Sequence, residues 1–401
     1  MLKVMLKNSI SALLLCSVLN ADKVQLSTDN MGDFLIAPLY IAKGDICSEV
    51  KIFNTNETSS ILAKVAFREH ISSHEVDFPI FLSPGDVWVG KVCQTESGSV
   101  CLTSTDDSNH PSAMQTLKYG QNLKSHSSDA TYRHADMSKG YVEIEGKSYA
   151  IQEFQKENID FTKGYIEVFP IAQFYEGTTK KVNKNILVER WDSLERGDLS
   201  IKNLSKYGVD SKSLSGLVSF ETSNQETSSI PMTAFKGAHD VQLTGSAISY
   251  NSDASTEILL GKNKKIAILK LLQKGNVSFT YNDAGVDQYI HILFPFSHKE
   301  KQTRRYKLII RDLEENKYTM IFSPIPKMSN EISMFCIEDL VSLTRDTIKF
   351  NEGMIQIKEI TNNDTVQLGK NKIASILPTL SRIKTIGNKS MVINTIYIPV
   401  K

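Results

Sequence analysis

Residues 61–92, ILAKVAFREHISSHEVDFPIFLSPGDVWVGKV, decide the fold that we predict for this chain. Apolar side chains alternate with other side chains along residues 61–67 and again along residues 76–82, and the break at 70–74 separates the two runs. A period of two is typical of a β-strand whose two faces differ, and two such runs joined by a short polar segment indicate an antiparallel hairpin.

The residues that follow the second run predict a tight turn and a third strand. Pro84 is suited to the position that needs φ near −65°, and Gly85 to the next position, where φ is positive. The segment Ser83-Pro84-Gly85-Asp86 therefore predicts a type II turn. Trp88 begins the strand behind it, and we expect its indole to fill the core of a β domain.

Similar strand patterns recur through the whole chain. The runs are short, rich in Val, Ile, Phe and Tyr, and separated by turn residues; further strands are predicted over 34–41, 49–54, 100–104, 140–144, 165–172, 217–221, 277–281, 289–296, 306–312, 318–323, 354–360 and 391–400. A parallel sheet would require amphipathic helices between these runs, and the sequence does not show such an alternation. We predict a mainly β protein, built from antiparallel β-sandwich domains with a few short helices.

The length of 401 residues exceeds one usual core and predicts two β-sandwich domains behind a leader. Residues 1–21 carry two lysines, a short apolar run and a final Ala, which together indicate a cleaved signal peptide. We place the first domain at 22–210, with a long loop at 104–138 and short helices near 185–207. The second domain is placed at 211–401.

The charge balance excludes one class of partner. Loss of the two leader lysines leaves 44 basic against 45 acidic residues, so the chain carries no electrostatic footprint for nucleic acid. No later segment is long and apolar enough to span a membrane. We expect an exported protein, at the cell surface, extracellular or in the periplasm, whose partners are other envelope or surface proteins or further copies of itself.

Four cysteines remain after the predicted leader, and export would permit disulfides. Cys93 and Cys101 flank a loop with a Gly near its middle, between two apparent strands. We predict a bridge between these two residues across the hairpin. Whether Cys47 pairs with Cys336 is left open, because such a bridge needs the two halves of the chain to pack together.

Charged residues cluster at the facing ends of the predicted hairpin: Arg68 and Glu69 end the first strand, and Glu75 and Asp77 begin the second. Opposed charges on the solvent face of a hairpin pair across the strands. We therefore expect these four residues, together with Pro84, Gly85 and Trp88, to have structural roles. The alternative is a pair of carboxylates for hydrolysis, which would need a buried cleft.

Metal and cofactor chemistry finds little support in the residue spacing. Asp106 and Asp107 could supply oxygen ligands to calcium, but the Asp-x-Asp-x-Asp-Gly spacing is absent and an Asx turn explains them equally well. His70 and His74 lie in a loop and lack the helical spacing of a zinc motif. With no GxSxG and no phosphate-binding loop in the sequence, we expect no catalytic, metal or cofactor residues.

Six segments of the chain form a recurrent pattern: APLY at 37–40, KIFNTNE at 51–57, AKVAFREH at 63–70, SHEVDFPIFLSPGDVW at 73–88, TSTDDS at 103–108 and GYIEVFPIAQF at 164–174. Together they resemble an uncharacterised family of exported bacterial β-rich proteins. The resemblance implies a β-rich protein of the cell envelope or a secreted one, and it brings no established activity with it.

The function expected from these features is that of a non-enzymatic structural or interaction protein of the cell envelope or surface, assembling through exposed strand edges. Pro79, which has no N–H donor, marks one expected edge or bulge. A periplasmic ligand-binding protein is the first alternative. A hydrolase of envelope polymers is the second, so enzymatic activity is left open.

Overall fold

The computed structural model describes most of the first β domain and the strands of the rest of the chain. The described residues are 24–69, 75–111, 113–122, 131–133, 141–144, 147–150, 156–158, 161–174, 185, 188–189, 212–223, 227–238, 276–282, 286–295, 306–313, 317–322, 332–336, 352–359, 379–386 and 389–397. The predicted leader at 1–21 and nearly all of the predicted helical region near 185–207 lie outside them.

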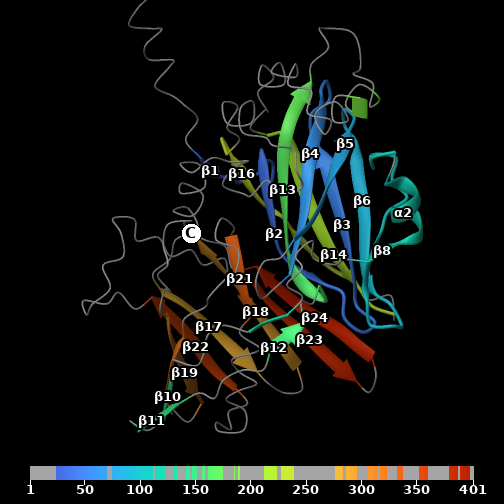
Figure 1. The fold of residues 1–401 in the computed structure, drawn as a ribbon. Coiled ribbons are helices and arrows are strands. Elements are labelled where there is room, and N and C mark those ends of the chain that lie inside the picture. The colour runs from blue at the N-terminus through green and yellow to red at the C-terminus, as the bar shows by residue number, and fades with distance from the viewer. Residues whose placement is uncertain are drawn as a thin grey trace, which may run out of the picture.

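Two antiparallel six-stranded sheets form a β-sandwich, as predicted (Figure 1). Sheet A has the order β1 (Gln25–Leu26), β16 (Thr233–Lys236), β2 (Phe34–Ile41), β13 (Lys163–Phe174), β4 (Ser60–Glu69) and β5 (Glu75–Leu82). Sheet B has the order β15 (Thr227–Pro231), β14 (Leu214–Glu221), β3 (Cys47–Asn54), β6 (Val87–Gln94), β7 (Val100–Thr103) and β8 (Gln121–Asn122).

The predicted hairpin is confirmed. β4 and β5 pair antiparallel with Ile61 opposite Leu82, and the turn behind them has the expected geometry. Gly85 has φ of +69°, and the N–H of Asp86 donates to the carbonyl oxygen of Ser83 over 3.1 Å. These are the features of a type II turn, because its third residue needs positive φ and its ends are joined by a hydrogen bond.

The core lies between the two sheets, and the strands of sheet B alternate as a strand with one covered face should. In β3, Val50 and Ile52 are buried while Glu49 and Lys51 are partly exposed on the outer face. Trp88 of β6 is fully buried among these residues, as predicted from its place in the sequence.

Sheet A differs from the sequence-based expectation, because β2 and β4 are buried at every position. Alternation in 61–67 predicted one solvent-facing side. Instead, β4 is a central strand between β13 and β5, and its outer face is covered as completely as its inner face.

A short helix, α2 (Met114–Tyr119), lies in the segment predicted as a long loop and packs against β7. Figure 1 shows it beside β8. Leu117 is buried, and its carbonyl oxygen accepts a hydrogen bond of 3.0 Å from the N–H of Ser104. The helix therefore covers the end of sheet B near β8.

The later strands form two more antiparallel sheets and one two-stranded ribbon. Sheet C consists of β11 (Lys147–Ala150), β10 (Tyr141–Ile144), β20 (Lys317–Phe322), β19 (Tyr306–Asp312), β22 (Glu352–Glu359) and β17 (Asn276–Asn282). Sheet D consists of β21 (Ile332–Cys336), β18 (Val286–Pro295), β23 (Thr379–Ile386) and β24 (Lys389–Tyr397), and the ribbon pairs β12 (Lys156–Asn158) with β9 (Thr131–Arg133).

Strands from both sides of the predicted domain boundary at 210/211 pair with one another. β14 follows that boundary but pairs with β3, and β16 pairs with β2, so both complete the first sandwich. Conversely, β10 precedes the boundary but pairs with β20 of sheet C. A linear boundary could not anticipate this exchange, because strand pairing joins segments by register and not by order in the chain.

Candidate functional site

Four charged side chains form a compact group on the outer face of sheet A, which we call the ionic cluster: Lys64 and Arg68 of β4, Asp77 of β5 and Glu167 of β13. Lys64 and Arg68 are four positions apart and point to the same face of the strand. Ala66 lies between them and stands opposite both Asp77 and Glu167 in register, so its small side chain leaves room for both acids.

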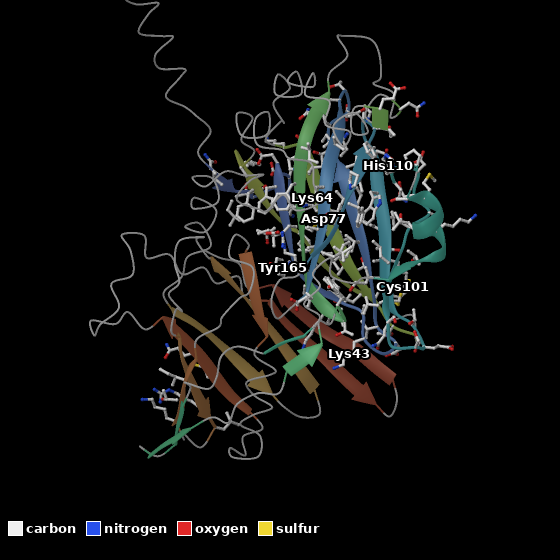
Figure 2. The ribbon with its side chains drawn as sticks, viewed as in Figure 1. Lys43, Lys64, Asp77, Cys101, His110 and Tyr165 are labelled. Atoms are coloured by element: carbon white, nitrogen blue, oxygen red, sulfur yellow. A yellow bond between two sulfur atoms is a disulfide. The ribbon has the colours of Figure 1, made fainter. Side chains whose placement is uncertain are left out.

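Each cation of the ionic cluster contacts one acid from a neighbouring strand. Arg68 Nε lies 2.5 Å from Glu167 Oε2, and both side chains are fully buried. Lys64 Nζ pairs with Asp77 Oδ2, and these side chains are 7% and 4% exposed. Figure 2 shows Lys64 and Asp77 side by side on the sheet. Together the two pairs join β4 to both of its neighbours.

The structure corrects the predicted arrangement of the hairpin charges. Arg68 stands opposite Glu75 in register, and it also forms an ion pair with Glu167, 99 residues further along the chain. Arg68, Glu69 and Asp77 are buried and not on a solvent face. The error arises because β13 inserts between β2 and β4, a long-range pairing that the hairpin sequence does not encode.

Burial decides what the ionic cluster can do. Taking charges out of water is costly, and such groups are retained where they are paired and hydrogen-bonded inside the protein. Side chains this deeply buried are not in reach of a substrate in solution. Their chemistry is therefore that of structural ion pairs, in which each acid fixes the strand beside it.

A second polar network surrounds the loop at 104–109, which follows β7 and leads to α2. Trp88 Nε1 donates to Asn109 Oδ1 over 2.8 Å, and Asn109 Nδ2 donates to Ser104 Oγ over 3.0 Å. The N–H of Phe81 in β5 donates to the carbonyl oxygen of Ser108 over 2.8 Å. This loop therefore ties the core tryptophan of sheet B to the edge strand of sheet A.

Asp106, one of the two calcium candidates, forms an Asx turn inside this loop. Its Oδ1 accepts the N–H of Ser108 over 2.8 Å, and its Oδ2 accepts the N–H of Val89 over 3.1 Å. Both oxygens thus hold backbone donors. Among the described residues, no group of three or more His, Cys, Asp and Glu side chains is arranged to hold a metal ion. His70 and His74 lie outside the described residues.

Three cysteines stand in one row across the outer face of sheet B, which we call the cysteine row: Cys47 of β3, Cys93 of β6 and Cys101 of β7. Cys93 is the register partner of Cys101, and the neighbouring pair of Ser48 with Val92 places Cys47 opposite Cys93 on the other side. The disulfide joins Cys47 to Cys93, with Cα atoms 4.5 Å apart, and Cys101 is a free thiol. The predicted Cys93–Cys101 bridge is wrong.

Strand register explains which pair is bridged. The N–H of Thr95 donates to the carbonyl oxygen of Ser99, so these two residues form a hydrogen-bonded pair next to the loop. Hydrogen-bonded pairs recur at every second position of an antiparallel ladder, and Cys93 and Cys101, two residues away from the loop on each strand, therefore form the next one. Cys47 and Cys93 form the alternate, non-hydrogen-bonded pair, in which side chains lie closer together. A disulfide needs Cβ atoms about 3.8 Å apart, which the non-hydrogen-bonded pair provides more readily.

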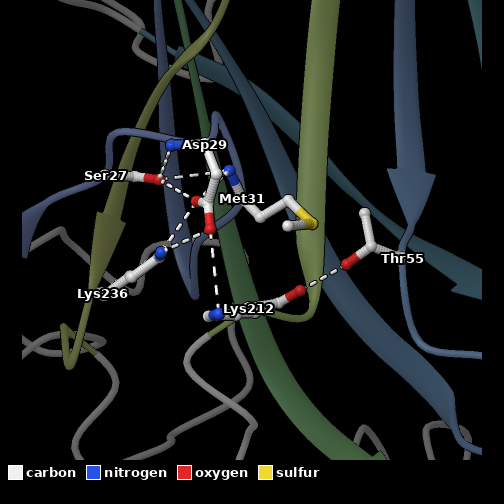
Figure 3. A network of polar contacts seen from close by, with 6 residues as sticks. All are labelled: Ser27, Asp29, Met31, Thr55, Lys212 and Lys236. Atoms are coloured by element: carbon white, nitrogen blue, oxygen red, sulfur yellow. Dashed lines mark hydrogen bonds and ion pairs between the residues drawn. The ribbon is translucent and has the colours of Figure 1, made fainter.

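An exposed network lies at the end of sheet A near β1 and β16 (Figure 3). Asp29 accepts hydrogen bonds from Lys236 Nζ over 2.8 Å and from Ser27 Oγ over 2.6 Å, and Lys212 Nζ lies 3.8 Å from its carboxylate. The hydrogen bond from Lys236, followed by that from Ser27, holds the pKa of the Asp29 carboxyl well below its ordinary value. The network anchors the first described segment to β16.

Comparisons with known proteins return no relative: no family model, no curated protein and no solved structure matches this chain. Among the described residues, no helix has the length and apolar character needed to cross a membrane.

The functional residues that the sequence did not reveal share one property: each contacts a partner from another strand or loop. Lys64 and Glu167 were not singled out, nor was Asn109 as the partner of Trp88. The only available signal was the position of Lys64 and Glu167 inside otherwise apolar strands, where a charge requires a partner if both strand faces are covered.

Proposed function

We propose that this protein is a non-enzymatic structural or interaction module that works outside the cytoplasm, in the cell envelope or at the cell surface. The ionic cluster is the observation that supports this proposal most strongly. Two of the four hairpin charges, Arg68 and Asp77, are buried in ion pairs that join neighbouring strands of sheet A. They stabilise a scaffold and do not present groups to a substrate.

The disulfide supports the exported location. Disulfides form and persist in oxidising compartments, and the Cys47–Cys93 bridge ties two central strands of sheet B. The predicted signal peptide leads to the same location.

The strand edges indicate how a partner would be bound. β5 is the edge strand of sheet A, and the N–H of Phe81 points away from β4 to Ser108. Alternate residues of a strand point their nitrogens to the same side, so the nitrogen of Pro79 also faces away from β4. In β15, the edge strand of sheet B, the N–H of Met232 points to β14, so the nitrogen of Pro231 faces outward. Proline at these positions removes the donor that an added strand would use. We therefore propose recognition through side-chain surfaces and not through strand addition at these two edges.

Protease shaving of intact cells, followed by size analysis of the extracted protein, tests the proposal. We expect cleavage on intact cells and a native size larger than the monomer. Protection until the outer envelope is opened would favour the periplasmic alternative. A ligand-dependent rise in melting temperature of a monomeric protein would replace the interaction role with ligand binding, and hydrolysis of an envelope polymer by the pure protein would establish an enzyme.

A further inference from the structure

We propose that Cys93 is shared between two alternative disulfides, so that the free thiol of Cys101 exchanges with the Cys47–Cys93 bridge and forms a Cys93–Cys101 bridge. The proposal rests on the cysteine row and not on the proposed function. In that row Cys93 has one cysteine beside it on each neighbouring strand, and all three point to the outer face of sheet B.

The chemistry is a redox-neutral thiol–disulfide exchange. The Cys101 thiolate attacks Cys93 Sγ, the bond between Cys47 Sγ and Cys93 Sγ breaks, and Cys47 leaves as a thiolate that takes up the proton lost by Cys101. Attack on a disulfide requires the three sulfurs to approach a line. A row perpendicular to three adjacent strands supplies the required order, because the outer cysteines flank the central one on opposite sides.

The Cys101 sulfur lies toward Gly120 of the α2–β8 connection and not toward Cys93. A Cβ atom added to Gly120 would lie 2.4 Å from Cys101 Sγ, so the sulfur occupies space that only a glycine leaves open, on the side of β8. Rotation about the Cα–Cβ bond of Cys101 turns the sulfur from Gly120 toward β6. Partial burial also raises the pKa of the Cys101 thiol, so the nucleophilic thiolate becomes more abundant as the pH rises.

The charged groups on the same face do not block the exchange. Lys91 Nζ of β6 pairs with Glu221 Oε2 of β14 at 2.5 Å, and Lys51 pairs with Glu49 within β3 at 2.5 Å. Glu221 stands opposite Cys47 and not opposite Cys101. Lys91 and Glu221 therefore compensate each other's charge on this face of the sheet.

The two bridges constrain the sandwich differently. The Cys47–Cys93 bridge closes a chain segment with a sequence separation of 46 and links β3 to β6. The Cys93–Cys101 bridge would link two strands already joined by a short hairpin loop. Exchange therefore releases the covalent tie between two central strands of sheet B without any change in the number of disulfides.

Disulfide mapping by mass spectrometry tests the exchange. Cleavage after Lys91 and Glu96 separates Cys93 from Cys101, and cleavage after Lys43 and Glu49 isolates Cys47. In the Cys47→Ser variant of the full chain, purified under oxidising conditions and alkylated, we expect the Cys93–Cys101 linkage in most molecules. The Cys93→Ser variant is the matched control, and its Cys47 and Cys101 should both be alkylated, because they stand two strands apart.

A measurement on the unmodified protein keeps the test independent of the folding of the variants. The folded protein is incubated at pH 8.5 without an added thiol, quenched with acid and alkylated. We expect label on Cys47 to rise at the expense of label on Cys101, and no such rise in Cys101→Ser. Label confined to Cys101, together with free Cys93 and Cys101 in folded Cys47→Ser, would overturn the proposal, as would bridges formed only between two chains.

Discussion

Arg68 and Glu167 form an ion pair in which both side chains are fully buried. Removal of one partner from a buried pair leaves the other charge in a low-dielectric environment without its counter-ion. We predict that Arg68→Met lowers the free energy of unfolding by about 3–5 kcal/mol, and that Arg68→Met with Glu167→Leu recovers most of this loss. Urea unfolding followed by circular dichroism measures both.

The matched control for this prediction is the half-exposed pair of Lys91 and Glu221, whose side chains are 39% and 41% exposed. Water screens such a pair, so Lys91→Met is expected to change stability by less than about 1 kcal/mol. Equal losses in the two variants would show that the burial of Arg68 has no energetic consequence and would contradict the structural role of the ionic cluster.

Asp29 makes a prediction about pH. Its folded-state pKa is depressed, chiefly by the hydrogen bond from Lys236, so its contribution to stability is present above the unfolded-state value of about 3.9 and declines as the pH falls below it. In Lys236→Met, we expect the pKa of the Asp29 carboxyl to rise toward its ordinary value. Carboxyl chemical shifts followed by NMR between pH 2 and pH 6 measure it, and an unshifted titration would assign the depression to Ser27 instead.

At the scale of the elements, the Cys47–Cys93 bridge has the clearest measurable effect. A disulfide stabilises mainly by restricting the unfolded chain, and the effect grows with the length of the closed segment. We predict that Cys93→Ser, in which neither Cys47 nor Cys101 has a bridging partner beside it, lowers the free energy of unfolding by about 2–4 kcal/mol. Cys101→Ser, which removes only the free thiol, should stay within about 0.5 kcal/mol of the parent protein. Similar stabilities for both variants would show that the bridge is dispensable.

The edge strand β5 gives a prediction about association. Pro79→Thr restores an outward N–H donor in the middle of this edge, and an unprotected edge is a template for a second chain. We expect concentration-dependent self-association of this variant in sedimentation velocity experiments. Pro84→Thr, which lies in a turn and adds no edge donor, is the control. A monomeric Pro79→Thr variant would mean that the loop at 104–109 protects the edge on its own.

Local elements were predictable because the information for them is local. The turn at Ser83–Asp86 needs only Pro84 and Gly85 in sequence, and the hairpin needs only its alternation. The partners of Cys93 and Arg68 were not predictable, because they depend on which strand lies beside β6 and β4 and in what register. β13, β14 and β16 join the first sandwich from distant parts of the chain, and no short pattern encodes that arrangement.

For the whole molecule, three features combine into one account. The ionic cluster fixes the pairing of sheet A, the disulfide ties the centre of sheet B, and outward-facing prolines protect two edges. A scaffold of this kind suits a protein that persists outside the cytoplasm and meets partners there through its side-chain surfaces. Function on this account depends on the location and association of the folded protein and not on turnover of a substrate.

Protease shaving of intact cells tests that claim most directly, when the native size of the protein and the state of Cys47 and Cys93 are determined on the same sample. The account predicts cleavage before the outer envelope is opened, a complex larger than the monomer and an oxidised Cys47–Cys93 pair. A monomer that stays protected until the cell is lysed, with Cys47 and Cys93 both reduced, would contradict it.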